Sequence, residues 1–436
     1  MRKKMGSGNY KIVTFGCQMN LADSGLLASI LDSNGYRAVN TESEADIIIL
    51  NTCSVREKAE TRVFGRLAEL SALKKQDGKK IVVIGCMAQR LGQNLIGRAP
   101  YVDLVLGTDR IFDLPQYLNN GCQFPAVNTD FGLELPEDII PVRDNPFTAF
   151  MTISRGCNNY CAYCIVPYVR GRERSYPVRQ TVEQINNLVA DGVVEIMLLG
   201  QNVNSYRDNH QDFTDLLFLI TAETRVERIR FMTSHPKDMS DRLIEFIGSE
   251  PRMMNHVHLP LQSGSDRILE QMRRGYTLDH YLSLVQKLRR AVPDISLTTD
   301  LIVGFPSETA EDYQATLKAV EEIGFDSAFM FRYSMREGTA AARLVDDVPE
   351  DEKIDRLKRL ITLQKNVAFR KNQDEIGKIR KVLIDGRSRR SDQILKGKTE
   401  GHKTVLVPGN TSLIGTIQKT RIISADSWTL QGQLMK

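Results

Sequence analysis

Three cysteines at the spacing C-x3-C-x2-C lie near the middle of the chain, as Cys157, Cys161 and Cys164. Thiolates this close together can bind one iron–sulfur cube, and so short a run has no fourth thiolate, so one iron keeps an open corner. An open metal corner can hold a small molecule, as an open zinc site holds water or substrate. The alternatives are a partial zinc knuckle and a chance cluster, but zinc usually takes a second cysteine pair and none follows in the sequence.

Three further cysteines are far apart in sequence, but each follows a strand-like run rich in Val and Ile. Helical patterns over 21–34 and 57–75 lie between these runs. Continuous apolar runs between helices predict a doubly wound parallel sheet that is covered on both faces. The predicted strands are 11–16, 45–50, 80–85 and 102–107.

Cys17, Cys53 and Cys86 are thereby predicted at the carboxyl ends of three parallel strands. Ligands bind at that edge of such a sheet, and the helix starts that follow favour thiolate. We therefore expect a second cluster with three cysteine ligands and an open iron. A buried structural thiol is the alternative for any one of the three. Cys122 follows the turn signal Asn119-Asn120-Gly121 and is predicted to be a plain free thiol.

Strands and helices alternate again after an irregular, polar stretch over 121–147 that suits a linker. Six βα units predict a partial parallel barrel, (βα)6, with its active site at the carboxyl ends of the strands. The cysteine loop follows the first of these strands. The predicted strands are 148–154, 194–199, 228–234, 256–262, 295–303 and 327–334, and the helical patterns include 182–191, 241–249, 281–291 and 311–323.

The cysteine spacing, with Tyr163 before the last cysteine, resembles the radical S-adenosylmethionine (SAM) superfamily. The resemblance implies that the free iron binds the amino and carboxylate groups of SAM, and that an electron from the cluster cleaves SAM to a 5′-deoxyadenosyl radical. The polar strand ends resemble the SAM-binding ridges of that superfamily, although each could be an ordinary turn or cap and Tyr163 a packing aromatic. The implied SAM-binding residues are Tyr163, Gly200, Gln201, Asn202, Ser234, Gln262, Asp300 and Val303.

The surroundings of the first three cysteines resemble the methylthiotransferase family of radical SAM enzymes. The motifs are Gly16-Cys17-Gln18-Met19-Asn20, Asn51-Thr52-Cys53-Ser54-Val55-Arg56 and Gly85-Cys86-Met87-Ala88-Gln89, and the likeness extends over nearly the whole chain. The Gln-Met-Asn after Cys17 is similar to the MiaB-type branch, which acts on tRNA.

This resemblance implies two [4Fe-4S] clusters, with all six cysteines as catalytic, metal-binding residues. One SAM would methylate a sulfur of the auxiliary cluster and a second SAM would yield the radical. The methylthio group would then reach C2 of N6-isopentenyladenosine at position 37 of tRNA. The base must leave its stack, so we expect the two trios to face one another across a cavity.

Two alternatives stay open. The same chemistry could modify a threonylcarbamoyladenosine in tRNA or a ribosomal protein, as in other branches of the family. The protein could instead be a non-catalytic RNA-binding metal-cluster protein. For the enzyme we expect an electron donor such as flavodoxin or ferredoxin, and a monomer.

Two other groups of polar residues invite a functional interpretation. His256 and His258 face the same side of one strand, which permits a metal pair but favours structural histidines. Arg170, Arg172 and Arg174 would share a face if their segment is extended. They could form a solvated basic edge or anchor RNA phosphates.

The C-terminal segment combines a predicted long amphipathic helix with short strands. The helix covers 350–381, with Leu357, Leu360, Ile361 and Leu363 on its apolar side. The short strands after it predict a small β-barrel of the oligonucleotide-binding kind. Residues 372–436 carry 12 Lys and Arg against 6 Asp and Glu, a net +6. The segment resembles a TRAM domain, a tRNA-binding module, although a basic structural cap is the alternative. The expected RNA contacts are Arg387, Arg389, Arg390, Lys396 and Lys398.

Length and composition fit an α/β multidomain protein. The 436 residues carry a net charge of +4, with seven cysteines, which does not indicate a disulfide scaffold. We find neither a signal peptide nor an apolar run of membrane-spanning length, so we expect a cytoplasmic protein without a membrane partner. The expected domains are 8–125, which holds the auxiliary cluster, 143–371, the radical SAM core, and 374–436, the TRAM-like domain.

Overall fold

The computed structural model describes residues 8–54, 57–119, 121–132, 139–388 and 391–435. It divides into two compact units. The first comprises Met1–Asp144, Arg155–Asn158 and Cys164–Arg174, and the second comprises Asn145–Ser154, Asn159–Tyr163 and Ser175–Lys436. The boundary between the units thus passes through the central cysteine loop.

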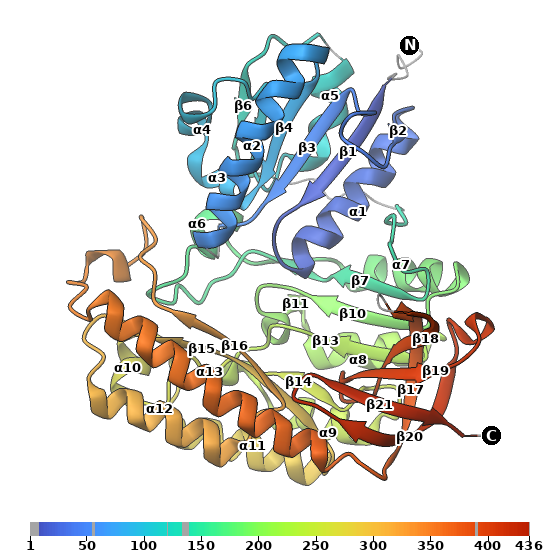
Figure 1. The fold of residues 1–436 in the computed structure, drawn as a ribbon, viewed down its shortest axis with the longest axis vertical. Coiled ribbons are helices and arrows are strands. Elements are labelled where there is room, and N and C mark those ends of the chain that lie inside the picture. Colours follow the sequence, from blue (N-terminus) through green and yellow to red (C-terminus); the bar gives the residue numbers. More distant parts are fainter. Residues whose placement is uncertain (1–7, 55–56, 120, 133–138, 389–390, 436) are drawn as a thin grey trace. The chain divides into compact units, whose positions relative to one another are not determined.

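The first unit is built on a six-stranded parallel sheet in the order β2-β1-β3-β4-β5-β6 (Figure 1). Ile47 and Ile49 pack in one apolar cluster with Leu27 of helix α1, whereas Ile48 and Leu50 pack in another with Leu67 of helix α2. Both faces of the sheet are therefore covered, and the doubly wound prediction is confirmed. The elements are β1 (Asn9–Thr14), α1 (Gln18–Ser33), β2 (Arg37–Ala38), β3 (Ile47–Thr52), α2 (Glu57–Asp77), β4 (Lys80–Gly85), α3 (Cys86–Leu91), α4 (Gln93–Arg98), β5 (Leu104–Leu106), α5 (Leu114–Asn119), β6 (Ala126–Asn128) and α6 (Val166–Arg170).

Two details of this sheet differ from the prediction. Strands β1 and β3 are displaced by two residues in opposite directions from the predicted 11–16 and 45–50. Strand β6 lies inside the predicted linker and pairs in parallel with β5. It has only three residues, too few to produce a periodic pattern in the sequence.

Six parallel strands of the second unit follow one another in chain order, as two three-stranded sheets, β13-β10-β7 and β14-β15-β16. The backbone N–H of Met254 donates to Ile229 O over 3.0 Å, next to the junction of the two sheets. The six-unit partial barrel is thus confirmed. Its elements are β7 (Thr148–Thr152), α7 (Val178–Ala190), β10 (Glu195–Leu199), α8 (Phe213–Glu223), β13 (Arg228–Phe231), α9 (Asp241–Ser249), β14 (His256–His258), α10 (Asp266–Gln271), α11 (Leu278–Ala291), β15 (Ser296–Val303), α12 (Ala310–Ile323) and β16 (Ser327–Arg332).

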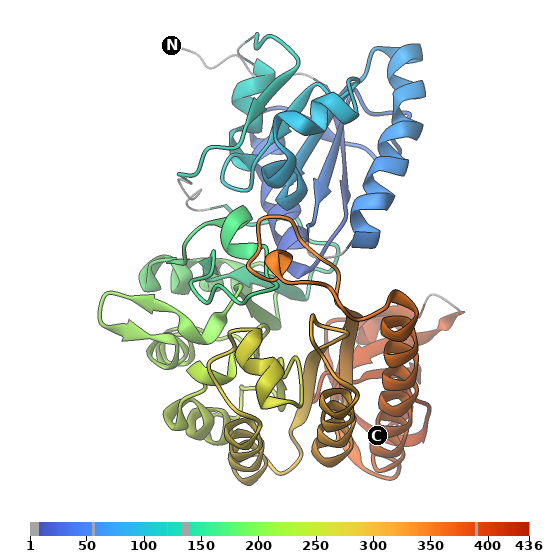
Figure 2. The ribbon, with the colours of Figure 1, turned by 90° about the vertical axis from the view of Figure 1, so that its left-hand side faces the viewer.

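Helix α13 (Glu350–Gln373) runs beside α12 and packs on β16 (Figures 1 and 2). It ends before the predicted limit of 381, because Gly377 takes a positive φ of 88° and the chain then enters the next strand. Leu360 is buried as expected, but the placement of Ile361 on the apolar side is wrong, since Ile361 is 40% exposed.

The C-terminal strands form a closed barrel in the order β17-β18-β19-β21-β20, which confirms the predicted small β-barrel. Alternate residues such as Val382, Ile384, Val405 and Val407 fill its interior. Its strands are β17 (Ile379–Ser388), β18 (Ser391–Lys398), β19 (Thr404–Pro408), β20 (Ile417–Ala425) and β21 (Thr429–Leu434). In the described part of the chain no helix combines the length and the apolar character needed to cross a membrane.

Candidate functional site

The strand order of the first unit places a topological switch point between β1 and β3. From there the chain proceeds outward in opposite directions, which opens a crevice at the carboxyl ends of the strands. Cys17 is the N-cap of α1 after β1, Cys53 directly follows β3, and Cys86 opens α3 directly after β4. The expected placement of these cysteines at one edge of the sheet is therefore confirmed.

A pair of buried amides joins the segments that carry Cys17 and Cys53. The Nδ2 of Asn20 donates to Asn51 Oδ1 over 2.8 Å and to Thr52 O over 3.1 Å, while Asn51 Nδ2 donates to Asn20 O over 2.9 Å. Cys17 Sγ lies 3.5 Å from Asn20 Oδ1. These polar groups hold the two cysteine segments together at the switch point.

Two glycines allow the backbone to approach closely at the same edge. A Cβ at Gly16 would lie 3.1 Å from Cys53 Cβ, and a Cβ at Gly85 would lie 2.6 Å from Thr52 O. Gly85 also takes a positive φ of 92°, which a side chain would oppose. Gly16 precedes Cys17 and Gly85 precedes Cys86, and both positions are therefore glycine for a steric reason.

Arg170 is a buried partner of Cys86. Its Nε donates to Cys86 Sγ over 3.3 Å, and its Nη2 donates to Asp23 Oδ2 over 3.2 Å. Arg155 forms a second ion pair with the other oxygen of the Asp23 carboxylate. Burial raises the pKa of the Cys86 thiol, and the neighbouring guanidinium of Arg170 opposes that rise.

The prediction that Arg170, Arg172 and Arg174 share one face of an extended segment is wrong. Arg170 is the last residue of helix α6 and is only 4% exposed, so it does not belong to a solvated edge. Arg174 donates to both oxygens of Asp109, over 2.8 and 2.9 Å. Of the three, Arg172 is the exposed side chain. A helix begins at Val166, although no strong apolar periodicity in the sequence predicts it. The helix changes the directions of these side chains.

The surroundings of the first trio fit an iron–sulfur cluster. Thiolates are the usual ligands of such clusters. The Nη1 of Arg170 and the Oγ of Ser54 are buried and find no hydrogen-bond partner in the described residues, so both could serve a bound group. No three His, Cys, Asp or Glu side chains within the described ranges form a group that could hold a metal ion as they stand. A four-iron cube spreads its ligands more widely than one ion does. The lack of a single-ion site in the described residues is therefore compatible with a cluster at the first trio.

The central trio is divided between the units. Cys157 and Cys164 belong to the first, where the Cys157 backbone N–H donates to Gly171 O over 3.2 Å. Cys161 belongs to the second and is buried. There Arg274 donates through Nη1 to Cys161 Sγ over 3.2 Å and to the Tyr163 hydroxyl over 3.4 Å.

The strand ends of the second unit carry several buried polar atoms that lack a hydrogen-bond partner among the described residues. Gln201 Oε1, Asn202 Oδ1 and Gln262 Oε1 are among them. Gln262 also takes a positive φ of 72°, a strained conformation for a residue with a side chain. Unsatisfied polar atoms and local strain at the carboxyl ends of barrel strands fit a bound polar ligand such as SAM.

Other predicted residues at these strand ends are engaged by the protein itself. Ser234 donates through Oγ to His258 O over 2.5 Å, and Asp300 Oδ2 lies 3.5 Å from His258 Nε2. Val303 is fully buried, and a Cβ at Gly200 would lie 2.4 Å from Ser154 Oγ. These four residues shape the carboxyl end of the partial barrel.

Comparison with known proteins agrees with this geometry. The family model described as uncharacterized protein family UPF0004 matches residues 9–107, the radical SAM superfamily matches 151–320, and the TRAM domain matches 373–435. The tRNA-2-methylthio-N(6)-dimethylallyladenosine synthase of Moorella thermoacetica is 44% identical over 98% of both chains. The protein of the same name from Bacteroides thetaiotaomicron is 46% identical over 97% of this chain and 95% of its own.

The chain belongs to the family of tRNA-2-methylthio-N(6)-dimethylallyladenosine synthases. It is a radical SAM tRNA methylthiotransferase of the MiaB type, as the sequence predicted. Radical SAM membership brings one [4Fe-4S] cluster and SAM, and the matched region contains Cys157, Cys161 and Cys164, so the zinc-knuckle alternative has no support.

Solved structures show the fold alone. The radical SAM methyltransferase TsrM from Kitasatospora setae, solved with cobalamin and a [4Fe-4S] cluster, has a TM-score of 0.58 at 12% identity, covering 77% of this chain and 74% of its own. The cobalamin-dependent SAM radical enzyme OxsB has a TM-score of 0.53 at 14% identity, covering 82% of this chain and 56% of its own.

The two histidines of β14 both contact the neighbouring strand β15. His256 Nε2 and His258 Nδ1 each lie 3.0 Å from Thr298 Oγ1. Burial lowers the pKa of His256, which therefore stays neutral. The interpretation as structural histidines agrees with these contacts.

The predicted RNA contacts of the barrel differ in their surroundings. Arg387 is exposed, and Lys396 pairs with Asp385 over 3.5 Å while its side chain stays 44% exposed. Lys398 donates to Thr404 Oγ1 over 2.9 Å and burial lowers its pKa, so it is a poor phosphate contact. Arg389 and Arg390 lie outside the described residues.

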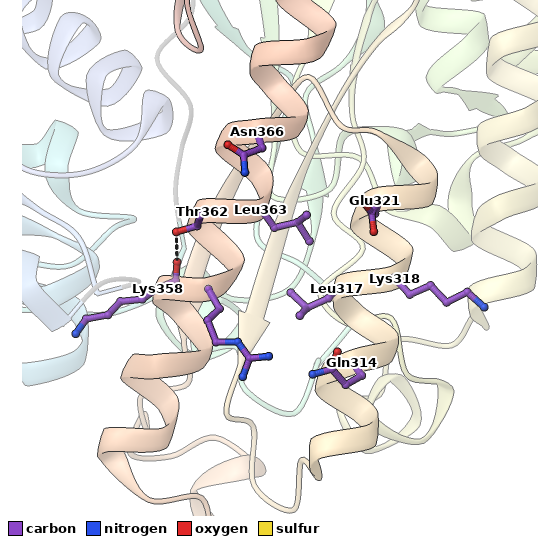
Figure 3. A pocket seen from close by; sticks show the side chains of 9 residues that line it. Gln314, Leu317, Lys318, Glu321, Lys358, Thr362, Leu363 and Asn366 are labelled. Atoms are coloured by element: carbon purple, nitrogen blue, oxygen red, sulfur yellow. Dashed lines mark hydrogen bonds between the residues drawn. The ribbon is translucent and has the colours of Figure 1, made fainter.

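A groove of about 580 Å³ between α12 and α13 is separate from these groups. Leu317 and Leu363 point toward each other across it, whereas the side chains of Lys318 and Lys358 extend away from it on opposite sides (Figure 3). It contains no cysteine and carries no catalytic interpretation.

Three polar residues at the site were missed by sequence reasoning: Asp23, Arg155 and Arg274. Only Asp23 had a signal in the sequence. It falls on the buried stripe of α1, between Asn20 and Leu27, where a charged residue is unusual.

Proposed function

We propose that this enzyme transfers a methylthio group to C2 of N6-isopentenyladenosine at position 37 of tRNA. The support is the identity of 44–46% with synthases of this name, over at least 97% of the chain. The family models that match this chain span both cysteine trios and the C-terminal barrel. Neither relative reported above is named for the rival substrates, threonylcarbamoyladenosine and a ribosomal protein.

We further propose that Cys17, Cys53 and Cys86 hold a second [4Fe-4S] cluster. The clusters and SAM supply the sulfur, the methyl group and the radical that an unreactive aromatic C–H bond requires. The chain supplies the rest: Asn20 and Asn51 keep two ligand segments together, Gly85 lets a third approach, and Arg170 orients Cys86.

The SAM molecule would be held at the carboxyl ends of the partial barrel. The buried side-chain oxygens of Gln201, Asn202 and Gln262 can accept hydrogen bonds from its amino groups. Tyr163 would contact the adenine, and Arg274 fixes both Tyr163 and Cys161. The walls of this SAM site would be formed by Gly200, Ser234, Asp300 and Val303. Every predicted SAM-binding residue thus has a proposed role.

The remaining proposals concern the context of the reaction. We propose a cytoplasmic monomer that takes electrons from a flavodoxin- or ferredoxin-like donor and binds the anticodon stem-loop of tRNA. The domains would be 8–125, 143–371 and 374–436, with the short strand β6 added to the first.

Turnover in vitro tests the substrate. The reconstituted enzyme, with SAM and a reductant, should convert isopentenylated tRNA to the methylthio product and leave unmodified tRNA unchanged. Conversion of threonylcarbamoylated tRNA, with no reaction on isopentenylated tRNA, would contradict the proposal. Iron counting tests the second cluster, with about eight iron atoms expected for each chain.

A further inference from the structure

We propose that Arg170 is a positioning residue of the auxiliary cluster, holding the Cys86 thiolate through Nε and donating through Nη1 to a sulfur of the bound cluster. This inference rests on the proposed cluster at Cys17, Cys53 and Cys86. It assigns to Arg170 a direct electrostatic role in setting how readily that cluster accepts an electron.

The first observation is the direction of the side chain. Arg170 lies 84 residues from Cys86 along the chain, yet its Nε donates to Cys86 Sγ over 3.3 Å. Val169 of helix α6 and Ile165, its N-cap residue, pack in one apolar cluster with Cys86, which fixes the helix end beside the thiol. Arginine is rigid and planar at its head, so this contact also fixes the direction of the remaining N–H groups.

The second observation is an unsatisfied donor. Arg170 Nη2 is used by Asp23, but the buried Nη1 has no acceptor in the described residues. A buried guanidinium N–H without an acceptor is costly, and a sulfur of a bound cluster would satisfy it. The side chain thus has one NH2 group, that of Nη1, available for a ligand at this edge of the sheet.

The third observation is the balance of buried charge. Arg155 and Arg170 both pair with the carboxylate of Asp23, and Arg170 places a buried positive charge beside Cys86. Three thiolates are negative when they bind iron, so the positive charge of Arg170 favours them and favours the reduced cluster most. A similar contact recurs in the second unit, where Arg274 Nη1 lies 3.2 Å from Cys161 Sγ.

The test uses the full-length chain with Cys157, Cys161 and Cys164 all replaced by Ala, so that only the auxiliary cluster remains. In this background Arg170→Met is compared with Arg170→Lys and with Arg174→Met, a control on the same segment whose guanidinium donates to Asp109 and to the backbone carbonyl of Arg170 but to no cysteine in the described contacts. Iron content and the midpoint potential from EPR-monitored titration are measured after anaerobic reconstitution.

We expect Arg170→Met to lower the midpoint potential by at least about 59 mV, tenfold in the one-electron equilibrium, or to lose the cluster. Arg174→Met should match the background. Full iron content with an unshifted potential in Arg170→Met would overturn the inference. If Arg170→Met does not fold, Arg170→Lys decides: it should lose iron to a chelator several-fold faster than Arg174→Met, and equal rates would overturn the inference. A background chain that binds no iron would instead refute the proposed cluster.

Discussion

Cys86 illustrates how much of the chemistry depends on contacts between single residues. Its thiol is buried, which raises its pKa, yet a ligand to iron must be a thiolate. Arg170 supplies the compensating positive charge and Asp23 holds Arg170 in place. None of these partners is near Cys86 in sequence, so the spacing of the cysteines alone does not reveal how the thiolate is stabilised.

The two trios should differ in what their loss removes. We expect Cys17→Ala to keep reductive SAM cleavage but abolish transfer of the methylthio group, because its cluster stores the sulfur. Cys161→Ala should abolish both, since the radical arises at its cluster. Measurement of 5′-deoxyadenosine and of modified tRNA checks this, with Cys122→Ala as the control. Equal loss of SAM cleavage in the two variants would count against this division of roles.

Gly85 should tolerate no side chain. Gly85→Ala would force a Cβ toward Thr52 O, at 2.6 Å, in a backbone conformation that disfavours side chains. We expect a loss of about 1–3 kcal/mol in stability and lower iron content after reconstitution. Gly65→Ala is the matched control, because nothing lies within 4 Å of its Cβ, and it should be neutral or stabilising. An unchanged iron content and melting temperature in Gly85→Ala would contradict the steric explanation.

At the scale of elements, the bounds of helices and strands were predicted best where the apolar pattern in the sequence is long and regular. Strand β4 and helix α9 have the predicted bounds, whereas β6 was missed because it has three residues. Helix α12 begins with a capping box in which Thr309 and Asp312 satisfy each other's backbone N–H groups. Such local hydrogen bonds fix where an element begins, independently of its apolar face.

The capping carboxylate of α12 should make stability depend on pH. Hydrogen bonds from Arg267 and other donors outweigh burial and lower the pKa of Asp312 to about 2. Because its folded pKa lies below the unfolded value, Asp312 stabilises the fold fully above about pH 4, and this contribution, on the order of 2 kcal/mol, is lost as the pH falls through about 2.

Thermal melting of the metal-free wild type and of Asp312→Asn should therefore show a difference that is largest above pH 4 and shrinks toward pH 2. The use of metal-free chains removes the acid lability of the clusters from the comparison. A difference that stays constant over this range would show that the carboxylate charge does not contribute.

At the scale of the whole molecule, two compact units share the radical SAM loop, since Cys157 and Cys164 belong to one and Cys161 to the other. The C-terminal barrel lies in the second unit and carries the excess of basic residues. The expectation that the two trios face one another stays a prediction, and a magnetic interaction between the two reduced clusters would support it. That interaction should vanish when the three cysteines of either trio are replaced by Ala.

The barrel should contribute nonspecific affinity for tRNA. Replacing exposed Arg387 with Ala should weaken binding and reduce the slope of log affinity against log salt by roughly 0.7–0.9, one phosphate contact. Lys398→Ala is the contrasting variant, because its ammonium donates to Thr404. We expect Lys398→Ala to change stability more than the salt slope. Equal salt slopes for wild type and Arg387→Ala would remove Arg387 from the interface.

The sequence by itself determined the fold class and the family, and it predicted the domain boundaries and the six cysteine ligands. These follow from local spacing and periodicity, and from motifs whose residues are neighbours in the chain. Only the tertiary structure decided that Arg170 contacts Cys86, that Arg155 and Arg170 share Asp23, and that Lys398 donates to Thr404. Those pairings join segments 84 to 147 residues apart in the first unit. The packing of whole elements brings them together, and no local pattern in the sequence records it.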